Sequence, residues 1–246
     1  MRQAYVRLYA ELNDFLPPGR KTRTTTCRFD VCGSVKDMIE SIGVPHTEVD
    51  LILVNGEPAE FEYLVQDGDR ISVYPRFHSL DISTLAHLRP QPLREARFVT
   101  DTHLGRLAAY LRMLGFDTLY RNDSRDEDLA QLSASEGRIL LTRDRGLLKR
   151  TIVTRGYCLR STDPPRQLAE VLQRFDLVPA IAPFRRCMHC NAVLHPAEKE
   201  AISDRLLPDT KRHYDEFFMC PQCARIYWKG SHYRRMQRLI ESVTSS

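Results

Sequence analysis

The sequence contains no apolar run long enough to cross a membrane. Its longest apolar runs, Leu51–Val54 and residues 177–184, fall far short of the roughly 20 residues that a spanning helix needs. The first residues, MRQAYVRLYAELNDF, also lack the continuous apolar core of a signal peptide. We therefore expect a cytoplasmic protein with no membrane partner.

Two common catalytic signatures are missing as well. No glycine-rich phosphate loop of the GxxxxGK type occurs, so nucleotide hydrolysis is not supported, and no Ser-His-Asp signature stands out. The sequence has seven cysteines, and an odd number in a cytosolic chain argues against a disulfide framework.

The overall composition is that of a soluble globular protein. The chain has 246 residues, 42% hydrophobic and 28% charged, a length that favours two or three domains. Its net charge of +4 is unevenly spread: residues 1–80 hold 9 basic and 12 acidic side chains, residues 81–180 hold 16 and 13, and residues 181–246 hold 11 and 7. The basic remainder favours a polyanionic partner, although solvated surface arginines are an alternative explanation.

Residues 1–80 read as a β-grasp domain. The pattern predicts strands at 3–9, 24–31, 50–54 and around 70–75, with a helix that Ser34 caps and Gly43 ends. Small β-grasp carriers act through a free C-terminal Gly-Gly, whereas this segment runs on into the next domain. We therefore expect it to dock a protein partner or to shape the substrate entrance.

Residues 92–180 alternate between strand and helix patterns. Strands are expected at 98–99, 117–120, 138–142 and 157–160, and helices at 103–114, 126–136 and 165–175. This alternation is typical of an α/β domain with a parallel sheet and helices on both faces.

Acidic side chains follow the strands of this predicted sheet. Asp101 follows the first strand, Asp144 the third, and Asp123 and Asp126 lie between them. Because function gathers beyond the carboxyl ends of parallel strands, these acids can form an oxygen-ligand site for Mg²⁺ or Mn²⁺. Each also has a local explanation, since Asp101, Asp126 and Asp144 can cap helices and Asp123 can stabilise a turn.

Residues 181–246 contain two CxxC pairs. Cys187 and Cys190 are separated by 29 residues from Cys220 and Cys223, which predicts a tetrahedral four-thiolate site for structural zinc. Two local disulfides or a redox pair are the alternatives. The segment GSHYRRMQRLIES (230–242) reads as a basic helix after the second pair.

Basic side chains near these sites are candidates for phosphate contacts. Aromatic residues lie among the basic ones around the second CxxC pair, a combination that can stack bases and bind phosphates. The candidate phosphate-binding residues are Arg106, Arg143, Arg145, Lys229, Arg234 and Arg235.

Long strings of the sequence resemble one family. The strings RFVTDTHLGRLAAYLRMLGFDTLYRND and EGRILLTRD, with RCMHCN and FFMCPQCARIYWKGSHYRRM, are similar to the Mut7-C RNase family of PIN-like nucleases over roughly residues 97–240. The N-terminal part resembles the ubiquitin-like domain often fused ahead of it. The resemblance implies a PIN-like fold and catalytic roles for Asp101, Asp126 and Asp144. The chain departs from the family pattern in two places. The helix at 103–114 holds no additional acid, for which Asp123 or Asp117 is a candidate substitute, and Ala224 stands where glycine commonly follows the last cysteine.

Together these observations predict three domains and one activity. The domains are a ubiquitin-like β-grasp domain (1–80), a PIN-like nuclease domain (92–180) and a zinc ribbon with a basic C-terminal helix (181–246). The predicted activity is Mg²⁺- or Mn²⁺-dependent hydrolysis of single-stranded or structured RNA. A catalytically inactive RNA-binding module and a protein-interaction adaptor acting through the β-grasp domain are the alternatives.

Overall fold

The computed structural model describes residues 1–75 and 95–244. The chain divides into two compact units, Met1–Arg94 with Asp126–Cys158, and Glu95–Arg125 with Leu159–Ser246. The predicted boundary between residues 80 and 92 lies outside the described residues, so the three domain ranges stay a prediction.

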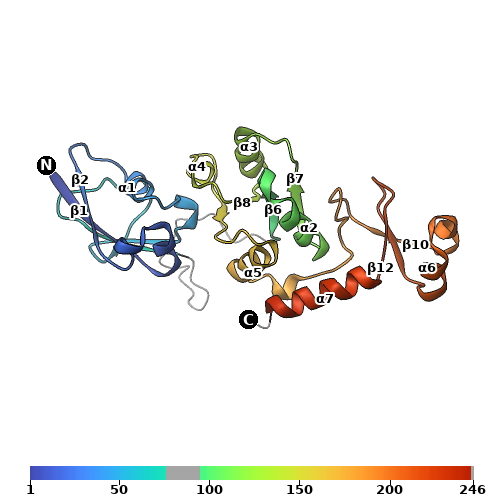
Figure 1. Cartoon of the computed structure of the whole chain (residues 1–246). Helices are drawn as coiled ribbons and strands as arrows, with labels where there is room; N and C mark the ends of the chain where they lie inside the picture. Colours follow the sequence, from blue (N-terminus) through green and yellow to red (C-terminus); the bar gives the residue numbers. More distant parts are fainter. Residues whose placement is uncertain (76–94, 245–246) are drawn as a thin grey trace. The chain divides into compact units, whose positions relative to one another are not determined.

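The first unit begins with a five-stranded sheet in the order β2-β1-β5-β3-β4 (Figure 1). Strand β1 pairs antiparallel with β2 and parallel with β5, and β5 pairs antiparallel with β3. This mixed sheet, with one helix, confirms the predicted β-grasp architecture. Its elements are β1 (Arg2–Leu8), β2 (Thr25–Phe29), α1 (Val35–Ile42), β3 (Leu51–Val54), β4 (Glu57–Pro58) and β5 (Arg70–Tyr74), with the short 3₁₀ helices η1 (Ala10–Phe15), η2 (Pro18–Arg20) and η3 (His46–Glu48).

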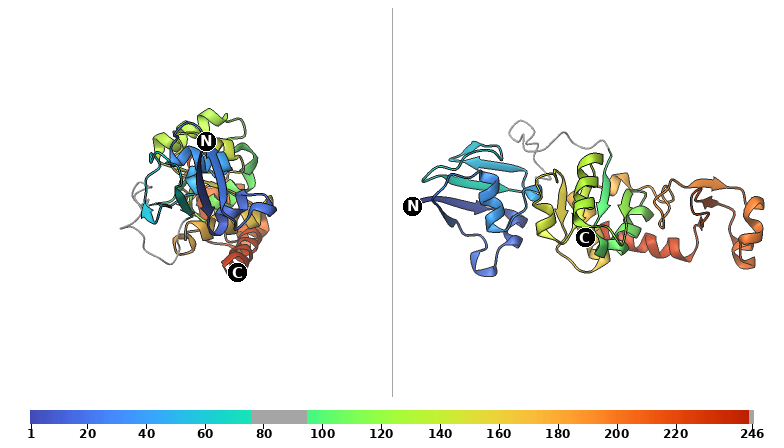
Figure 2. Two further views of the ribbon diagram at one scale, coloured as in Figure 1. Left: turned by 90° about the vertical axis from the view of Figure 1, so that its left-hand side faces the viewer. Right: turned by 90° about the horizontal axis from the view of Figure 1, so that it is seen from above.

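Local sequence explains these elements. Alternate side chains of β1, including Ala4, Val6 and Leu8, are buried, as a half-buried strand requires. Ser34 caps α1 by accepting a hydrogen bond from the Asp37 amide, and Gly43 ends the helix with a φ of 112°. Helix α1 lies beside the strands in Figure 1 and in the right-hand view of Figure 2.

The rest of the first unit is an α/β segment. It contains α3 (Asp126–Glu136), β8 (Ile139–Thr142), α4 (Arg145–Leu148) and β9 (Gly156–Cys158). Strands β8 and β9 pair in parallel, and all four residues of β8 are buried. Gly156 pairs with Leu140 in this register. A larger residue does not fit at this position, because an added Cβ would lie 2.5 Å from the Leu148 side chain.

The second unit contains another parallel strand pair, β6 with β7. In the helix predicted at 103–114, the side chains of Leu107, Ala108 and Leu111 are buried. Helix α2 packs against β7 and α5. These parallel pairs and their helices confirm the α/β class. The elements are β6 (Arg97–Thr100), η4 (Thr102–Leu104), α2 (Gly105–Met113), β7 (Asp117–Tyr120), α5 (Pro164–Arg174) and η5 (Val178–Ala180).

The second unit ends in a three-stranded antiparallel sheet in the order β10-β11-β12. A basic helix, α7, follows it as predicted and packs against α5; it is the red helix of Figures 1 and 2. Among the described residues, no helix is both long enough and apolar enough to span a bilayer. The elements are β10 (His195–Ala197), η6 (Glu200–Arg205), α6 (Pro208–His213), β11 (Phe217–Met219), β12 (Ile226–Trp228) and α7 (Ser231–Thr244).

Candidate functional site

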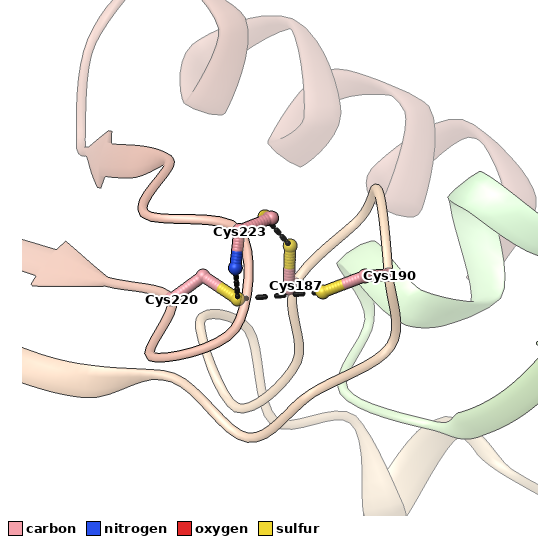
Figure 3. Close-up of side chains that lie close together, drawn as sticks. All are labelled: Cys187, Cys190, Cys220 and Cys223. Carbon is pink, nitrogen blue, oxygen red and sulfur yellow. Dashed lines mark hydrogen bonds between the residues drawn. The ribbon is translucent and has the colours of Figure 1, made fainter.

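The four cysteines of the two CxxC pairs come together, as the sequence predicts (Figure 3). Their Sγ atoms all lie within 4.8 Å of one another. The Cys187 and Cys223 sulfurs are 3.6 Å apart, and the Cys190 and Cys220 sulfurs are 3.3 Å apart. Zinc–sulfur bonds of about 2.3 Å in a tetrahedron place the sulfurs roughly 3.8 Å apart, so the donor set fits a tetrahedral ion.

Each CxxC pair is closed by the same backbone turn. The Asn191 amide donates to the Cys187 carbonyl (2.9 Å), and the Ala224 amide donates to the Cys220 carbonyl (2.9 Å). Asn191 and Ala224 both adopt left-handed backbone conformations, with φ of 70° and 56°. Glycine adopts this conformation without steric cost, whereas alanine at the second of these positions adopts it against its Cβ.

The thiols of the cluster differ in how readily they ionise. Burial opposes ionisation of Cys187, but hydrogen bonds from the Tyr227 hydroxyl (3.1 Å) and from the backbone lower its pKa to about 6. Burial raises the pKa of Cys190 to about 12 and also raises the pKa of Cys223. Without a cation, one thiolate forms easily and its neighbours resist, so four thiolates require a positive ion between them.

A buried arginine joins the first CxxC turn to the parallel strands. Arg112 of α2 donates from Nε to the Thr118 carbonyl (2.8 Å), and from Nη1 to the carbonyls of Met188 (3.2 Å) and His189 (2.8 Å). Burial lowers the pKa of this guanidinium. Its planar fork satisfies carbonyls on two separate segments at once.

A second set of bonds ties the same turn to β7. Asn191 accepts from the Thr118 amide (3.0 Å) and donates to an Asp117 carboxylate oxygen (2.8 Å). Arg186 contacts the other Asp117 oxygen at 3.3 Å. From the sequence, Asp117 is predicted as the first residue of a strand. The one local sequence feature that points to these bonds is the asparagine directly after the first CxxC pair.

Asp101 lies at the end of β6, as predicted, and is 6% exposed. Its Oδ1 accepts from the Thr102 amide (2.6 Å), and its Oδ2 is 3.3 Å from His103 Nδ1. The Tyr120 hydroxyl donates to the Thr102 carbonyl (3.0 Å) and lies over Gly105, where an added Cβ would be 2.7 Å from that hydroxyl. Strand β7 therefore supports the turn that orients Asp101.

Of the other three predicted acids, Asp126 and Asp144 lie in the first unit and Asp123 in the second. Asp144 caps α4, its Oδ1 accepting from the Gly146 amide (2.7 Å), and Asp126 is the first residue of α3. Asp123 lies in an exposed turn, where its hydrogen bonds to Arg121 (3.1 and 3.2 Å) lower its pKa. Since Asp101 belongs to one unit and Asp126 and Asp144 to the other, the shared metal site stays a prediction.

The predicted phosphate ligands have different surroundings. Arg106, Arg143, Arg145, Lys229 and Arg234 are all exposed, and Lys229 also pairs with Glu216 at 2.6 Å. The Arg145 Nη1 donates to the Phe15 carbonyl (3.1 Å), and its guanidinium carbon lies 4.9 Å from the Phe15 ring centre. The side chain of Arg235 lies outside the described part of α7.

Comparison with known proteins identifies two matching families. Residues 96–240 match the Mut7-C RNAse domain, and residues 1–81 match the Mut7-C ubiquitin domain. No curated protein matched the chain. Among solved structures, SAMP1 from Haloferax volcanii is similar at 20% identity, with 31% of this chain and 98% of SAMP1 covered and a TM-score of 0.26.

Proposed function

The chain belongs to the Mut7-C RNAse domain family, and from this membership we propose that it is a metal-dependent ribonuclease that hydrolyses RNA phosphodiester bonds. The observation that carries the proposal is the match over residues 96–240, more than half of the chain, which includes Asp101, Asp126 and Asp144. Asp101 directly follows β6 and Asp144 lies two residues after the end of β8, and both strands belong to parallel pairs, which supports the proposal.

The three acids would hold one or two Mg²⁺ or Mn²⁺ ions. Carboxylate oxygens are the ligands that these ions prefer. Asp144 uses Oδ1 for its backbone cap, and within the described part of the chain its Oδ2 has no hydrogen-bond partner. The backbone cap thus fixes the carboxylate and leaves one oxygen for an ion.

A bound divalent ion supplies an activated water and neutralises charge on the phosphodiester. The chain's own residues orient the acids: Thr102 and Tyr120 hold the turn at Asp101, and Gly146 holds Asp144. The exposed Arg106, Arg143 and Arg234, with Arg235 and Lys229, would bind RNA phosphates. Asp123, already paired with Arg121, would be the additional acid only after that pair opens.

The four-cysteine cluster would hold structural Zn²⁺. Four thiolates fill a tetrahedral shell and leave no position for water, so the ion would stabilise the fold and take no part in hydrolysis. Elemental analysis of the purified chain should find one zinc per chain, and Cys220→Ser should reduce that content.

Cleavage of mixed RNA tests the proposed activity. We expect the wild-type chain to cleave in Mn²⁺ and to stop in EDTA, and we expect Asp144→Asn to reduce the rate by a hundredfold or more, since about 2.7 kcal/mol of transition-state stabilisation is lost. Asp128→Asn, an exposed acid in the first turn of α3, is the matched control and should cleave normally. Cleavage that persists equally in Asp144→Asn would contradict the proposal.

A second candidate function rests on one departure from the family pattern. Helix α2 carries no carboxylate, so the chain lacks an acid in the place where the family's additional acid is expected. An RNA-binding protein without hydrolytic activity would bind the same RNA with and without Mn²⁺ and would leave it intact, which the same assay detects.

A further inference from the structure

We propose that the N-terminal β-grasp domain acts as an internal clamp on α4 and β9, and that Arg145 and Lys149 are positioning residues that keep Asp144 in place rather than ligands of RNA. The docking surface is formed by Phe15, the end of α1 and helix η3, all within the first unit. The consequence for Asp144 rests on the proposed function, whereas the docking itself does not.

The first contacts of the clamp come from the two basic side chains of the α4 segment. Arg145 donates to the Phe15 carbonyl and places its guanidinium over the Phe15 ring. Lys149 Nζ donates to the Glu40 carbonyl at the end of α1 (2.5 Å). Both charges are thus bound to backbone carbonyls of the β-grasp domain, and Arg145 also makes a cation–π contact.

A buried histidine of η3 joins the β-grasp domain to the chain segment that follows α4. His46 is 7% exposed, and its Nε2 lies 2.8 Å from the Val153 carbonyl, 107 residues away in the chain. A carbonyl can only accept, so Nε2 carries a proton and donates. The other ring nitrogen, Nδ1, lies 2.7 Å from a Glu40 carboxylate oxygen, which fixes the ring in this orientation.

Strand β9 is held by a carboxylate of the β-grasp domain. Glu48 is fully buried, and its Oε1 accepts a hydrogen bond from the Cys158 amide at the end of β9. A carboxylate that is removed from water in this way is costly unless its bonds are satisfied. Glu48 is therefore better explained as part of a permanent internal interface than as a surface for a transient partner.

Two of these contacts, those of Arg145 and Lys149, are made by the chain segment that directly follows Asp144. Arg145 directly follows Asp144 and begins α4, and the Asp144 side chain caps that helix through the Gly146 amide. A helix of four residues has little stability of its own, so its position depends on the groups that bind it. Releasing Arg145 and Lys149 should let α4 move and misorient the Asp144 carboxylate.

The test compares Arg145→Met with Arg143→Met in the full-length chain. Three quantities are measured: hydrogen exchange of residues 145–158, affinity for Mn²⁺ alone, and affinity for RNA in EDTA. For Arg145→Met we expect faster exchange and Mn²⁺ binding weakened by about tenfold, as for other residues that orient metal ligands, with unchanged RNA affinity. Arg143→Met should show the opposite result, weaker RNA binding with wild-type exchange.

A double-mutant cycle with Phe15→Leu distinguishes positioning from a general loss of stability. Phe15→Leu keeps an apolar side chain in the core but removes the ring under Arg145. If the two side chains act through one contact, the effect of the double variant on exchange and on Mn²⁺ affinity is smaller than the product of the single effects.

Each outcome decides the proposal. Unchanged exchange of residues 145–158 in Arg145→Met overturns the clamp, whether or not the chain cleaves RNA. Faster exchange with unchanged Mn²⁺ affinity, or weaker RNA binding with unchanged exchange, overturns the positioning role. If the wild-type chain neither binds Mn²⁺ nor cleaves RNA while Arg145→Met still exchanges faster, the docking holds and the proposed function fails.

Discussion

At the scale of single residues, Ala224, directly after the second CxxC pair, has a backbone conformation that its own side chain disfavours. Ala224 adopts a φ of 56°, a conformation in which the Cβ atom crowds the following carbonyl. The network of bonds in the turn, including the Ala224 amide to the Cys220 carbonyl, imposes this conformation. The chain therefore carries local strain beside a metal ligand.

Replacing Ala224 with glycine should stabilise the protein. Relief of the left-handed strain outweighs the greater freedom of glycine in the unfolded chain, giving a net gain of about 0.5–1 kcal/mol in the free energy of unfolding. Urea denaturation of the zinc-loaded chain measures it. The control is Ala197→Gly in strand β10, which should lose stability. A loss of stability in Ala224→Gly would show that the strain has been misassigned.

At the scale of elements, the four-cysteine cluster is joined to strand β7 by more than chain continuity. The Thr118 amide of β7 donates to the Asn191 side chain, and Arg112 binds both the first CxxC turn and the Thr118 carbonyl. The same strand supplies Tyr120, which supports the turn at Asp101. The proposed zinc site would thus help to order the surroundings of a proposed catalytic acid.

Removal of zinc should loosen β7. With a strong chelator, the first CxxC turn loses its metal, and Asn191 no longer protects the Thr118 amide. We expect hydrogen exchange at residues 117–120 to rise by about tenfold or more, equivalent to roughly 1.4 kcal/mol of lost protection. Strand β8 in the other unit serves as the internal reference and should exchange as before. Equal protection of β7 with and without zinc would show that the two elements are not coupled.

Much of the secondary structure could be predicted because its signals are local. The Ser34 cap and Gly43 stop define α1, and the apolar spacing of residues 104–114 defines α2. The cysteine spacing likewise predicts the four-sulfur cluster. The hydrogen bonds from Arg112 to His189 and from His46 to Val153 could not be predicted. They join residues 77 and 107 positions apart, respectively, with no periodic pattern between them.

The sequence also predicts a phosphate ligand where the structure shows an internal contact. Arg145 looks like its neighbour Arg143 in the string TRDRG, since both flank Asp144. Only the position of Phe15, 130 residues away, distinguishes the two arginines. Local sequence cannot show that one of two similar basic side chains contacts a distant part of the fold, and the role of Arg145 as a phosphate ligand stays a prediction.

At the scale of the whole molecule, the two matched domains differ in net charge. The acidic residues 1–80 match the Mut7-C ubiquitin domain, and the basic remainder matches the RNAse domain. An acidic N-terminal part repels a polyanion and so disfavours RNA on its surface, whereas the basic remainder attracts it. The β-grasp domain is then better suited to an internal structural role than to RNA binding.

The central claim is that Asp101, Asp126 and Asp144 hold the same metal. Calorimetric titration of the full chain with Mn²⁺ tests it most directly. The account predicts that Asp101→Asn, Asp126→Asn and Asp144→Asn each weaken the same binding event, by about tenfold or more, as expected when a ligand is lost from one site. If Asp101→Asn and Asp144→Asn instead abolish different binding events, or leave Mn²⁺ affinity unchanged, the acids do not share an ion and the account is contradicted.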